Sequence, residues 1–168
     1  KPSEIAMHVW MLDGDNTREQ EAIGVLGVNL IHGACYLADD PTALAKSLLD
    51  DLGHERLEVD LLRFSGPRFA HVDNRLVALD LVEYGLTRAT MFTAEGDVIQ
   101  PSEILYGRPV LIERGSFRPV TNATLDILKL ARASFQTISA GAFGAAVAVM
   151  EMTFDNLMER AHPIDRAE

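Results

Sequence analysis

The chain has 168 residues, 48% of them hydrophobic and 24% charged, which is typical of one folded globular domain and excludes a disordered or low-complexity segment. Its 25 acidic and 15 basic residues give a formal net charge of −10. This charge repels phosphate backbones and anionic headgroups at long range, so we expect neither nucleic acid nor a membrane as a partner. The longest apolar stretch, Ala22 to Ala38, is too short and too often interrupted by glycine for a membrane span.

The cysteine content and the start of the chain bear on cellular location and domain organisation. Cys35 is the single cysteine, so no internal disulfide can form and we expect a reducing, cytoplasmic compartment. The chain begins at Lys1 without an initiator methionine or a signal-peptide pattern. We therefore expect a piece of a longer protein, with a single α/β domain over residues 1–160 and a tail at residues 161–168.

Short apolar strands alternate with capped helices in the first half of the chain. Thr17 and Asp40 are good N-caps, Pro41 suits a first helical position, and Gly53 suits a helix stop. Glycines at three positions of the first helix, 24, 27 and 33, indicate close packing against a neighbouring element. The expected elements are a strand at residues 8–12, a helix at 17–37, a helix at 41–52, a strand at 57–64, and a helix that starts at 73 or 74 and ends at 85.

The same alternation continues in the second half. We expect a strand at residues 89–93, a turn at 94–97 leading into 98–99, a strand at 109–113, a helix from 121 or 122, a buried Gly/Ala-rich segment at 140–150, and a last helix to about 160. A hairpin or a flap is expected in the region of the turn and the strand at 109–113. Helices between successive strands are typical of crossover connections. The predicted fold is therefore a layered, Rossmann-like α/β fold with a mainly parallel sheet flanked by helices.

The loop at residues 113–121 is the strongest candidate for a binding site. It follows a predicted strand, precedes a predicted helix, and offers two guanidinium groups, hydroxyls and a glycine, which are the parts of a phosphate or carboxylate site. In the alternative interpretation, the two arginines pair with surplus carboxylates and Phe117 packs into the core. The candidate ligand-binding residues of this loop are Arg114, Gly115, Ser116, Arg118 and Thr121.

A second loop, containing Ser65 and Gly66, also follows a predicted strand. Ligands of open α/β sheets collect at the carboxyl ends of the strands, so this loop is a candidate for the other wall of the same crevice. A Gly-Pro turn without a functional role explains the same residues.

Two further patterns of polar residues also have simple structural explanations. Asp13, Asp15 and Thr17 follow an apolar strand, as in the haloacid dehalogenase-like phosphatases, although a solvated turn with a helix cap explains them too. His32 and Cys35 lie three residues apart on a predicted helix, but two ligands do not make a zinc site. We expect no metal, and the sequence identifies neither a cofactor nor a catalytic residue, because it contains no dinucleotide-binding glycine motif and no phosphate-binding Gly-Lys-Ser/Thr loop.

Several stretches together carry a family resemblance. They are 20–33 (QEAIGVLGVNLIHG), 63–67 (RFSGP), 72–75 (VDNR), 85–102 (GLTRATMFTAEGDVIQPS), 114–121 (RGSFRPVT) and 150–153 (MEMT). The chain resembles the middle part of a bacterial and cyanobacterial family labelled nicotinamide or nicotinate mononucleotide adenylyltransferase and, elsewhere, TonB-dependent receptor. An outer-membrane barrel needs many alternating strands that this sequence lacks, so the resemblance implies a nucleotidyltransferase of NAD metabolism. The His-x-Gly-His motif of such enzymes does not occur, so no catalytic residue is carried over.

The leading hypothesis is a domain that binds a nucleotide or another phosphorylated small molecule, with Arg114 and Arg118 holding the phosphates. The first alternative is a non-catalytic scaffold, in which the glycine-lined helix and residues 140–150 pack against a second copy or against flanking domains. The second alternative is a phosphatase that uses Asp13 and Asp15.

Overall fold

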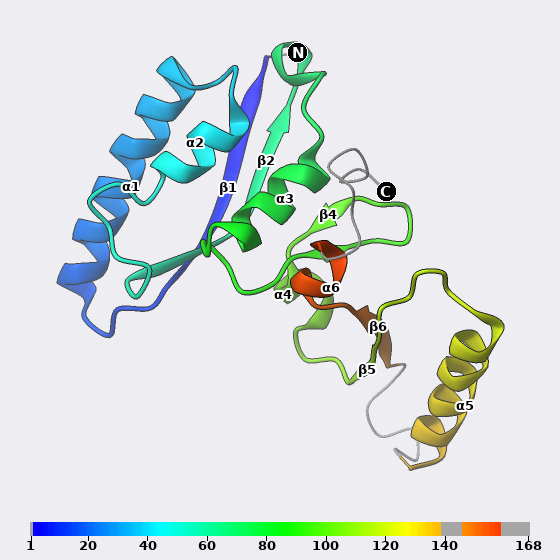
Figure 1. The fold of residues 1–168 in the computed structure, drawn as a ribbon. Helices are drawn as coiled ribbons and strands as arrows, with labels where there is room; N and C mark the ends of the chain where they lie inside the picture. The colour runs from blue at the N-terminus through cyan, green and yellow to red at the C-terminus, as the bar shows by residue number, and fades with distance from the viewer. Residues whose placement is uncertain (1, 139–145, 159–168) are drawn as a thin grey trace. The chain divides into compact units, whose positions relative to one another are not determined.

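The computed structural model describes residues 2–138 and 146–158. It divides the chain into two compact units, Lys1–Gln100 and Pro101–Glu168 (Figure 1). The expectation of a single domain over residues 1–160 stays a prediction. The tail expected at residues 161–168 lies outside the described residues.

Each of the three α-helices of the first unit has an aspartate as its N-cap. The sequence predicts this residue for the second and third helices. Asp40 accepts a hydrogen bond from the backbone N–H of Ala43 at 3.0 Å, and Asp73 accepts one from Arg75 at 2.9 Å. The first helix is capped by Asp15 rather than Thr17. The elements of this unit are β1 (Glu4–Met11), α1 (Asn16–Tyr36), α2 (Pro41–Ser47), β2 (Leu57–Ser65), the 3₁₀ turn η1 (Pro67–Phe69), α3 (Asn74–Glu83), β3 (Met91–Phe92) and β4 (Val98–Ile99).

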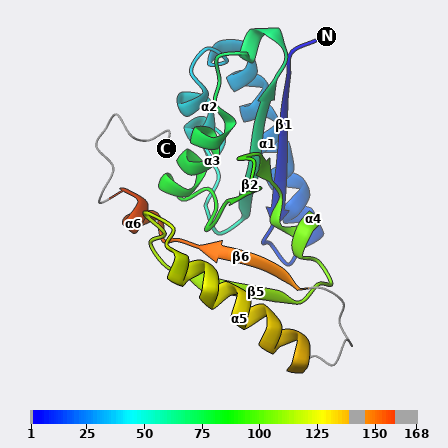
Figure 2. The same cartoon turned by 90° about the vertical axis from the view of Figure 1, so that its right-hand side faces the viewer.

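The predicted layered, mainly parallel, Rossmann-like sheet is wrong. The described residues instead form three two-stranded sheets, β1–β2, β3–β4 and β5–β6. The first two pairs are antiparallel, and the third is parallel. β1 and β2 form a long two-stranded ribbon, and both strands run upright in Figure 2. The fold is therefore mixed α/β without a continuous sheet.

The connection between β1 and β2 explains the wrong prediction. A single crossover helix reverses the chain once and delivers the next strand parallel to the first. Here α1 reverses the chain, and α2 with the segment 48–56 reverses it again, so β2 starts beside the end of β1. The backbone N–H of Leu12 accordingly donates to the carbonyl of Arg56 at 2.9 Å. Two helices between two strands thus give an antiparallel pair.

The core of the first unit lies between one face of the ribbon and the helices α1, α2 and α3. Leu44, Leu48 and Leu81 are fully buried there. In β1, the side chains packed against this core come from alternate positions, as expected for a strand with one buried face. These side chains are Ile5, Met7, Val9 and Met11.

A β-bulge changes the phase of β2 at Asp60. His8 pairs with Leu61 and the next residue, Val9, pairs with Val59, so Asp60 is the additional residue. The core-facing positions of β2 are accordingly odd before the bulge and even after it: Leu57 and Val59, then Leu62 and Phe64. Asp60 consequently lies on the opposite face of the ribbon, with His8 and Trp10.

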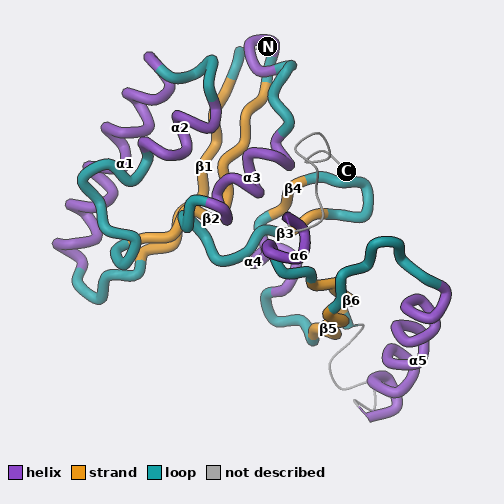
Figure 3. The backbone as a smooth tube through the Cα atoms, viewed as in Figure 1, coloured by secondary structure: helices purple, strands orange, loops and turns teal. Residues whose placement is uncertain are grey.

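The second unit is built around a β-α-β crossover. Its elements are α4 (Pro101–Leu105), β5 (Val110–Arg114), α5 (Asn122–Ile138), β6 (Val147–Glu151) and α6 (Phe154–Met158), with the strands drawn orange in Figure 3. The strand predicted at residues 109–113 and the helix predicted from residue 121 or 122 are confirmed. Of the predicted buried segment 140–150, residues 147–150 belong to β6 and residues 140–145 lie outside the described residues.

None of the helices within residues 2–138 and 146–158 is both long enough and apolar enough to cross a membrane.

Candidate functional site

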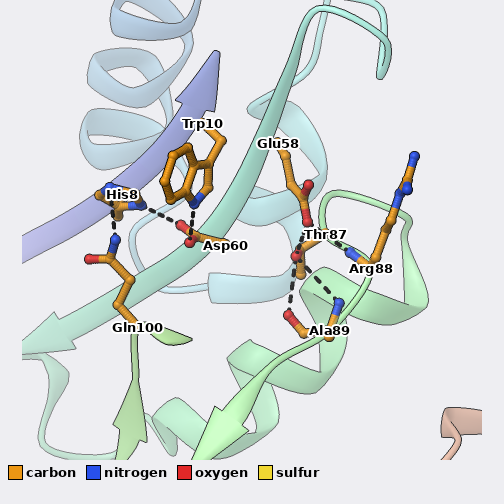
Figure 4. Close-up of polar contacts among 8 residues, drawn as sticks. All are labelled: His8, Trp10, Glu58, Asp60, Thr87, Arg88, Ala89 and Gln100. Carbon is orange, nitrogen blue, oxygen red and sulfur yellow. Dashed lines mark hydrogen bonds and ion pairs between the residues drawn. The ribbon is translucent and has the colours of Figure 1, made fainter. Parts of the chain in front are cut away.

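A buried carboxylate organises the polar face of the β1–β2 ribbon. Asp60, 7% exposed, accepts hydrogen bonds from Nδ1 of His8 at 2.6 Å and from Nε1 of Trp10 at 2.9 Å. Figure 4 shows both rings directed from β1 toward this carboxylate on β2. Because each oxygen has its own donor, the carboxylate holds the imidazole in one orientation.

The two ring nitrogens of His8 have different partners. An ionised carboxylate only accepts, so a neutral ring bound to it through Nδ1 carries its proton there. Nε2 is then an acceptor, and it lies 3.0 Å from the amide nitrogen of Gln100, which follows β4 (Figure 4). A histidine held in this way can take a proton at Nε2 once the amide moves aside.

The outer edge of β2 carries a second polar contact. Glu58 accepts hydrogen bonds from the hydroxyl of Thr87 at 2.5 Å and from the backbone N–H of Arg88 at 3.0 Å. Beside them, the backbone N–H of Val59 donates to the carbonyl of Leu86 at 2.9 Å. These bonds, drawn in Figure 4, fix the start of the segment 86–100. This segment contains the antiparallel pair β3–β4 and ends at Gln100.

An open hollow of about 710 Å³ lies near the same face. It is lined by Arg63 of β2, by the segment 70–75 at the start of α3, and by the hairpin residues 96–99. The even positions 62 and 64 face the core, so Arg63 points to the polar face, as does its strand partner Ala6. His8 follows Ala6 by two residues, about 7 Å along the strand.

The charged groups of the hollow differ in how they are paired. Asp73 binds the guanidinium of Arg75 through Nε at 3.0 Å and Nη2 at 2.6 Å. This contact lowers the pKa of Asp73 below its usual value and raises that of Arg75. The guanidinium of Arg63, in contrast, makes no hydrogen bond or ion pair with a described residue, and His71 is exposed. Arg63 is therefore the cation of this hollow that is available to an anion.

The predicted loop at residues 113–121 lies in the second unit, where its first arginine is already paired. Arg114 binds Glu151 of the neighbouring strand through two nitrogens, at 2.8 and 3.1 Å, which raises the pKa of Arg114. Ser116 and Thr121 are exposed, and Gly115 and Arg118 are half-buried. The pairing of Arg114 agrees with the structural interpretation of this residue, and ligand binding by the loop stays a prediction.

The predicted second wall, Ser65 and Gly66, belongs to the first unit. Gly66 has a φ of 91°, and a Cβ atom there would lie 2.5 Å from the carbonyl oxygen of Pro2 and 2.6 Å from Cα of Ser3. The glycine is thus required by the close approach of the N-terminal segment. A crevice shared by Ser65, Gly66 and the loop at 113–121 stays a prediction.

The two aspartates of the phosphatase alternative have structural partners. Asp13 binds Nε of Arg56 at 2.9 Å, and this contact raises the pKa of Arg56. Asp15 caps α1, and the backbone N–H groups of Thr17 and Arg18 lower its pKa. Within residues 2–138 and 146–158, no group of three or more His, Cys, Asp or Glu residues could hold a metal ion.

Sequence reasoning missed His8, Trp10, Asp60 and Arg63. The available indication was Asp60 itself, a charged residue between the core-facing Val59 and Leu62. A buried charge requires partners, but the bulge that turns Asp60 toward His8 and Trp10 cannot be inferred from the alternation of apolar residues.

Comparison of the chain with protein-family models, with curated proteins and with solved structures finds no match.

Proposed function

We propose that the first unit binds a phosphorylated small molecule in the hollow at Arg63. The single observation that carries this proposal is an arginine without a protein partner among the described residues, in a hollow of about 710 Å³. This site differs from the predicted loop at residues 113–121, whereas the proposed class of ligand is the same.

Charge and geometry support a phosphate as the recognised group. A guanidinium offers a planar fork of N–H donors that matches phosphate and carboxylate oxygens. His71 adds a second donor, and Arg75, although held by Asp73, lines the same hollow. The lining also contains the carboxylates of Asp73 and Asp97, so its two arginines make the hollow neutral in formal charge, and in a chain of net charge −10 it repels an anion less than the acidic surface does.

The size of the hollow supports a small molecule rather than a macromolecule. Its volume of about 710 Å³ lies within the roughly 300–1,000 Å³ of small-molecule sites. The resemblance to proteins labelled mononucleotide adenylyltransferases adds nicotinamide mononucleotide and ATP to the ligands to test. We propose that the protein acts in the cytoplasm, where these compounds occur and where a single cysteine stays reduced.

A thermal-shift screen tests the proposal. The ligands are nicotinamide mononucleotide, ATP, NAD and inorganic pyrophosphate, and a ligand at 100 times its Kd stabilises the folded state by about 2.7 kcal/mol. Arg63→Ala is expected to abolish the shift. Arg88→Ala is the matched control, because Arg88 is exposed in the same unit and its guanidinium contacts no described residue.

The screen also separates the hollow from the loop of the second unit. Arg118→Ala is expected to leave the shift unchanged. A shift that survives Arg63→Ala and disappears in Arg118→Ala assigns binding to the loop, and the absence of any shift in well-folded protein refutes the binding proposal.

A second role, proton transfer, is favoured by the Asp60–His8 contact. His8 presents Nε2 on the same face as Arg63, about 7 Å further along the strand. In the hydrolysis of a bound phosphoester, water gives its proton to Nε2 while its oxygen bonds to phosphorus. The ester oxygen leaves with the bonding electrons and takes a proton from solvent.

Release of p-nitrophenolate from p-nitrophenyl phosphate measures this step. His8→Gln is expected to abolish turnover while the thermal shift with pyrophosphate persists, and Asp60→Asn is expected to reduce turnover by about 10²-fold or more. Turnover that is equal in wild type and His8→Gln excludes His8 as the base without affecting the binding proposal.

A further inference from the structure

Charged side chains of both signs line the hollow of the first unit, and two of them have no partner among the described residues. Asp73 and Arg75 bind each other through two guanidinium nitrogens. The guanidinium of Arg63 and the carboxylate of Asp97 form no ion pair or hydrogen bond with a described residue, nor with one another. The hollow therefore presents one available positive charge and one available negative charge.

The turn of the β3–β4 hairpin holds Asp97 at this hollow. The backbone N–H of Thr93 donates to the carbonyl of Asp97 at 2.9 Å, and the N–H of Asp97 donates to the hydroxyl of Thr93 at 3.1 Å. Gly96 has a φ of 90° and lies against Arg75, since a Cβ atom there would be 3.6 Å from Cδ of that arginine. The carboxylate of Asp97 is therefore carried by a hydrogen-bonded turn, whereas Arg63 belongs to β2.

A phosphate bound to Arg63 leaves the charge of Asp97 uncompensated. The guanidinium pairs with the phosphate oxygens, but the phosphate is itself negative, so Asp97 repels it. The rest of the chain adds to this repulsion, because its formal net charge is −10. A ligand that is positively charged where it meets Asp97 removes the repulsion and gains a second ion pair.

We infer that the ligand of this hollow is a phosphate monoester that also carries a primary ammonium group, with the phosphate on Arg63 and the ammonium on Asp97. The inference rests on the proposed phosphate site at Arg63. An aminoalkyl phosphate is such a compound. Its ammonium offsets part of the phosphate charge, so an acidic protein repels it less than it repels pyrophosphate or ATP. An ammonium also offers three hydrogen-bond donors to a carboxylate, which only accepts.

A divalent metal ion between Asp97 and the phosphate fits the lining less well. The other side-chain oxygens of the hollow are engaged, those of Asp73 by Arg75 and Oδ1 of Asn74 by the N–H of Phe64 at 2.8 Å. In the described part of the chain, no group of three or more His, Cys, Asp or Glu residues could hold a metal ion. Sugar hydroxyls would satisfy the hydrogen bonding of Asp97 but would leave its charge unpaired. An ammonium needs only the one carboxylate that is available.

Kd values from ¹⁵N chemical-shift titrations of the whole chain test the inference. The ligands are aminoalkyl phosphates with linkers of about two to six carbon atoms, a range suited to a small-molecule site, each compared with the alkyl phosphate of the same length. In a buffer with EDTA, wild type is expected to bind at least one aminoalkyl phosphate about threefold or more tightly than the matching alkyl phosphate, as one solvated ion pair would give. Asp97→Asn is expected to remove this preference and to leave the binding of alkyl phosphates unchanged or tighter.

Glu95→Gln is the matched control, because Glu95 is exposed on the same turn but does not line the hollow. It removes the same charge as Asp97→Asn, so an equal loss of preference in both variants would be an effect of net charge and would overturn the inference. A wild type that binds each pair of compounds equally, or an ammonium preference that survives in Asp97→Asn, overturns it too. Alkyl phosphate binding that magnesium strengthens only in the presence of Asp97 assigns this carboxylate to a metal ion instead.

The alkyl phosphates separate this inference from the proposed function on which it rests. Their binding to wild type and its loss in Arg63→Ala support the phosphate site, whether or not an ammonium group adds affinity. If neither alkyl nor aminoalkyl phosphates bind to wild type, the phosphate site and the inference are both wrong.

Discussion

Asp60 accepts a hydrogen bond from Nδ1 of His8 at 2.6 Å, across a ribbon in which the two residues lie 52 positions apart in sequence. The contact exists because a bulge gives β2 one more residue than β1 at this point. The other oxygen of this carboxylate accepts a hydrogen bond from Nε1 of Trp10. One buried carboxylate of β2 therefore binds two side chains of β1.

Replacement of Asp60 by Asn is expected to destabilise the protein by about 1 kcal/mol, because the amide offers only one oxygen and leaves one partly buried donor, on His8 or Trp10, without its acceptor. Urea unfolding followed by far-UV circular dichroism measures this loss. Asp97→Asn is the control, since Asp97 is exposed and its side chain contacts no described residue. Equal stability of the two variants would mean that the Asp60 network contributes nothing to folding.

The side chain of Asn74 forms two hydrogen bonds with the backbone of Phe64, as a neighbouring strand would do at this edge of β2. Its Oδ1 accepts from the N–H of Phe64 at 2.8 Å, and its Nδ2 donates to the carbonyl at 3.0 Å. Asn74→Ala leaves both backbone groups unpaired and is expected to reduce the free energy of unfolding by about 1–3 kcal/mol. Asn74→Asp keeps the acceptor only, so its urea midpoint is expected between those of Asn74→Ala and wild type; an Asn74→Ala midpoint equal to wild type would contradict this role.

Gly66 is expected to tolerate no side chain. Its φ of 91° is strained for any residue with a side chain. An added Cβ atom would also lie 2.5 Å from the carbonyl oxygen of Pro2 and 2.6 Å from Cα of Ser3, so Gly66→Ala must displace the N-terminal segment. We expect a loss of about 1–3 kcal/mol in urea unfolding. Gly14→Ala serves as the control, because a Cβ atom at Gly14 meets nothing within 4 Å. If the two substitutions have the same effect, the close approach at Gly66 is not a constraint.

The Asp73–Arg75 pair predicts a small pH dependence of stability. The hydrogen bond from Arg75 holds the pKa of Asp73 below its ordinary value, so folding favours the ionised form. The contribution of this pair to stability is full at pH values above the pKa of Asp73 in the unfolded chain. It is lost as the pH falls through the lowered pKa of Asp73 in the folded state. Because the pair is partly solvated, the loss is about 0.2–1 kcal/mol. Urea midpoints from pH 6 to pH 2 are expected to fall less steeply in Asp73→Asn than in wild type, and identical slopes would contradict the assignment.

Local elements were predictable from the sequence because their determinants are local. Asp40 and Pro41 start α2, and Gly85, with a φ of 74°, ends α3 as predicted. α2 ends earlier than predicted, at Ser47, because Leu48 turns into the core through a bond from its N–H to the carbonyl of Ala45. The hairpin expected from the turn at residues 94–97 is also confirmed.

The strand pairing and the candidate site were not predictable, because they depend on residues far apart in sequence. The antiparallel ribbon follows from the second reversal of the chain after α1, which a pattern of alternating helices and strands does not reveal. Likewise, Glu151 lies 37 residues from Arg114, so the pairing that engages this arginine appears only in the structure. The same holds for Arg63, because the segment 70–75 and the β3–β4 hairpin line the hollow with it only in the folded chain.

The most direct test of the central claim is an amide chemical-shift map recorded while nicotinamide mononucleotide or pyrophosphate is added to the ¹⁵N-labelled protein. Binding in the hollow predicts saturable shifts at Arg63, at residues 71–75 and at residues 96–99, and their loss in Arg63→Ala. Shifts confined to residues 114–121, or no shifts with either ligand, would contradict binding at Arg63.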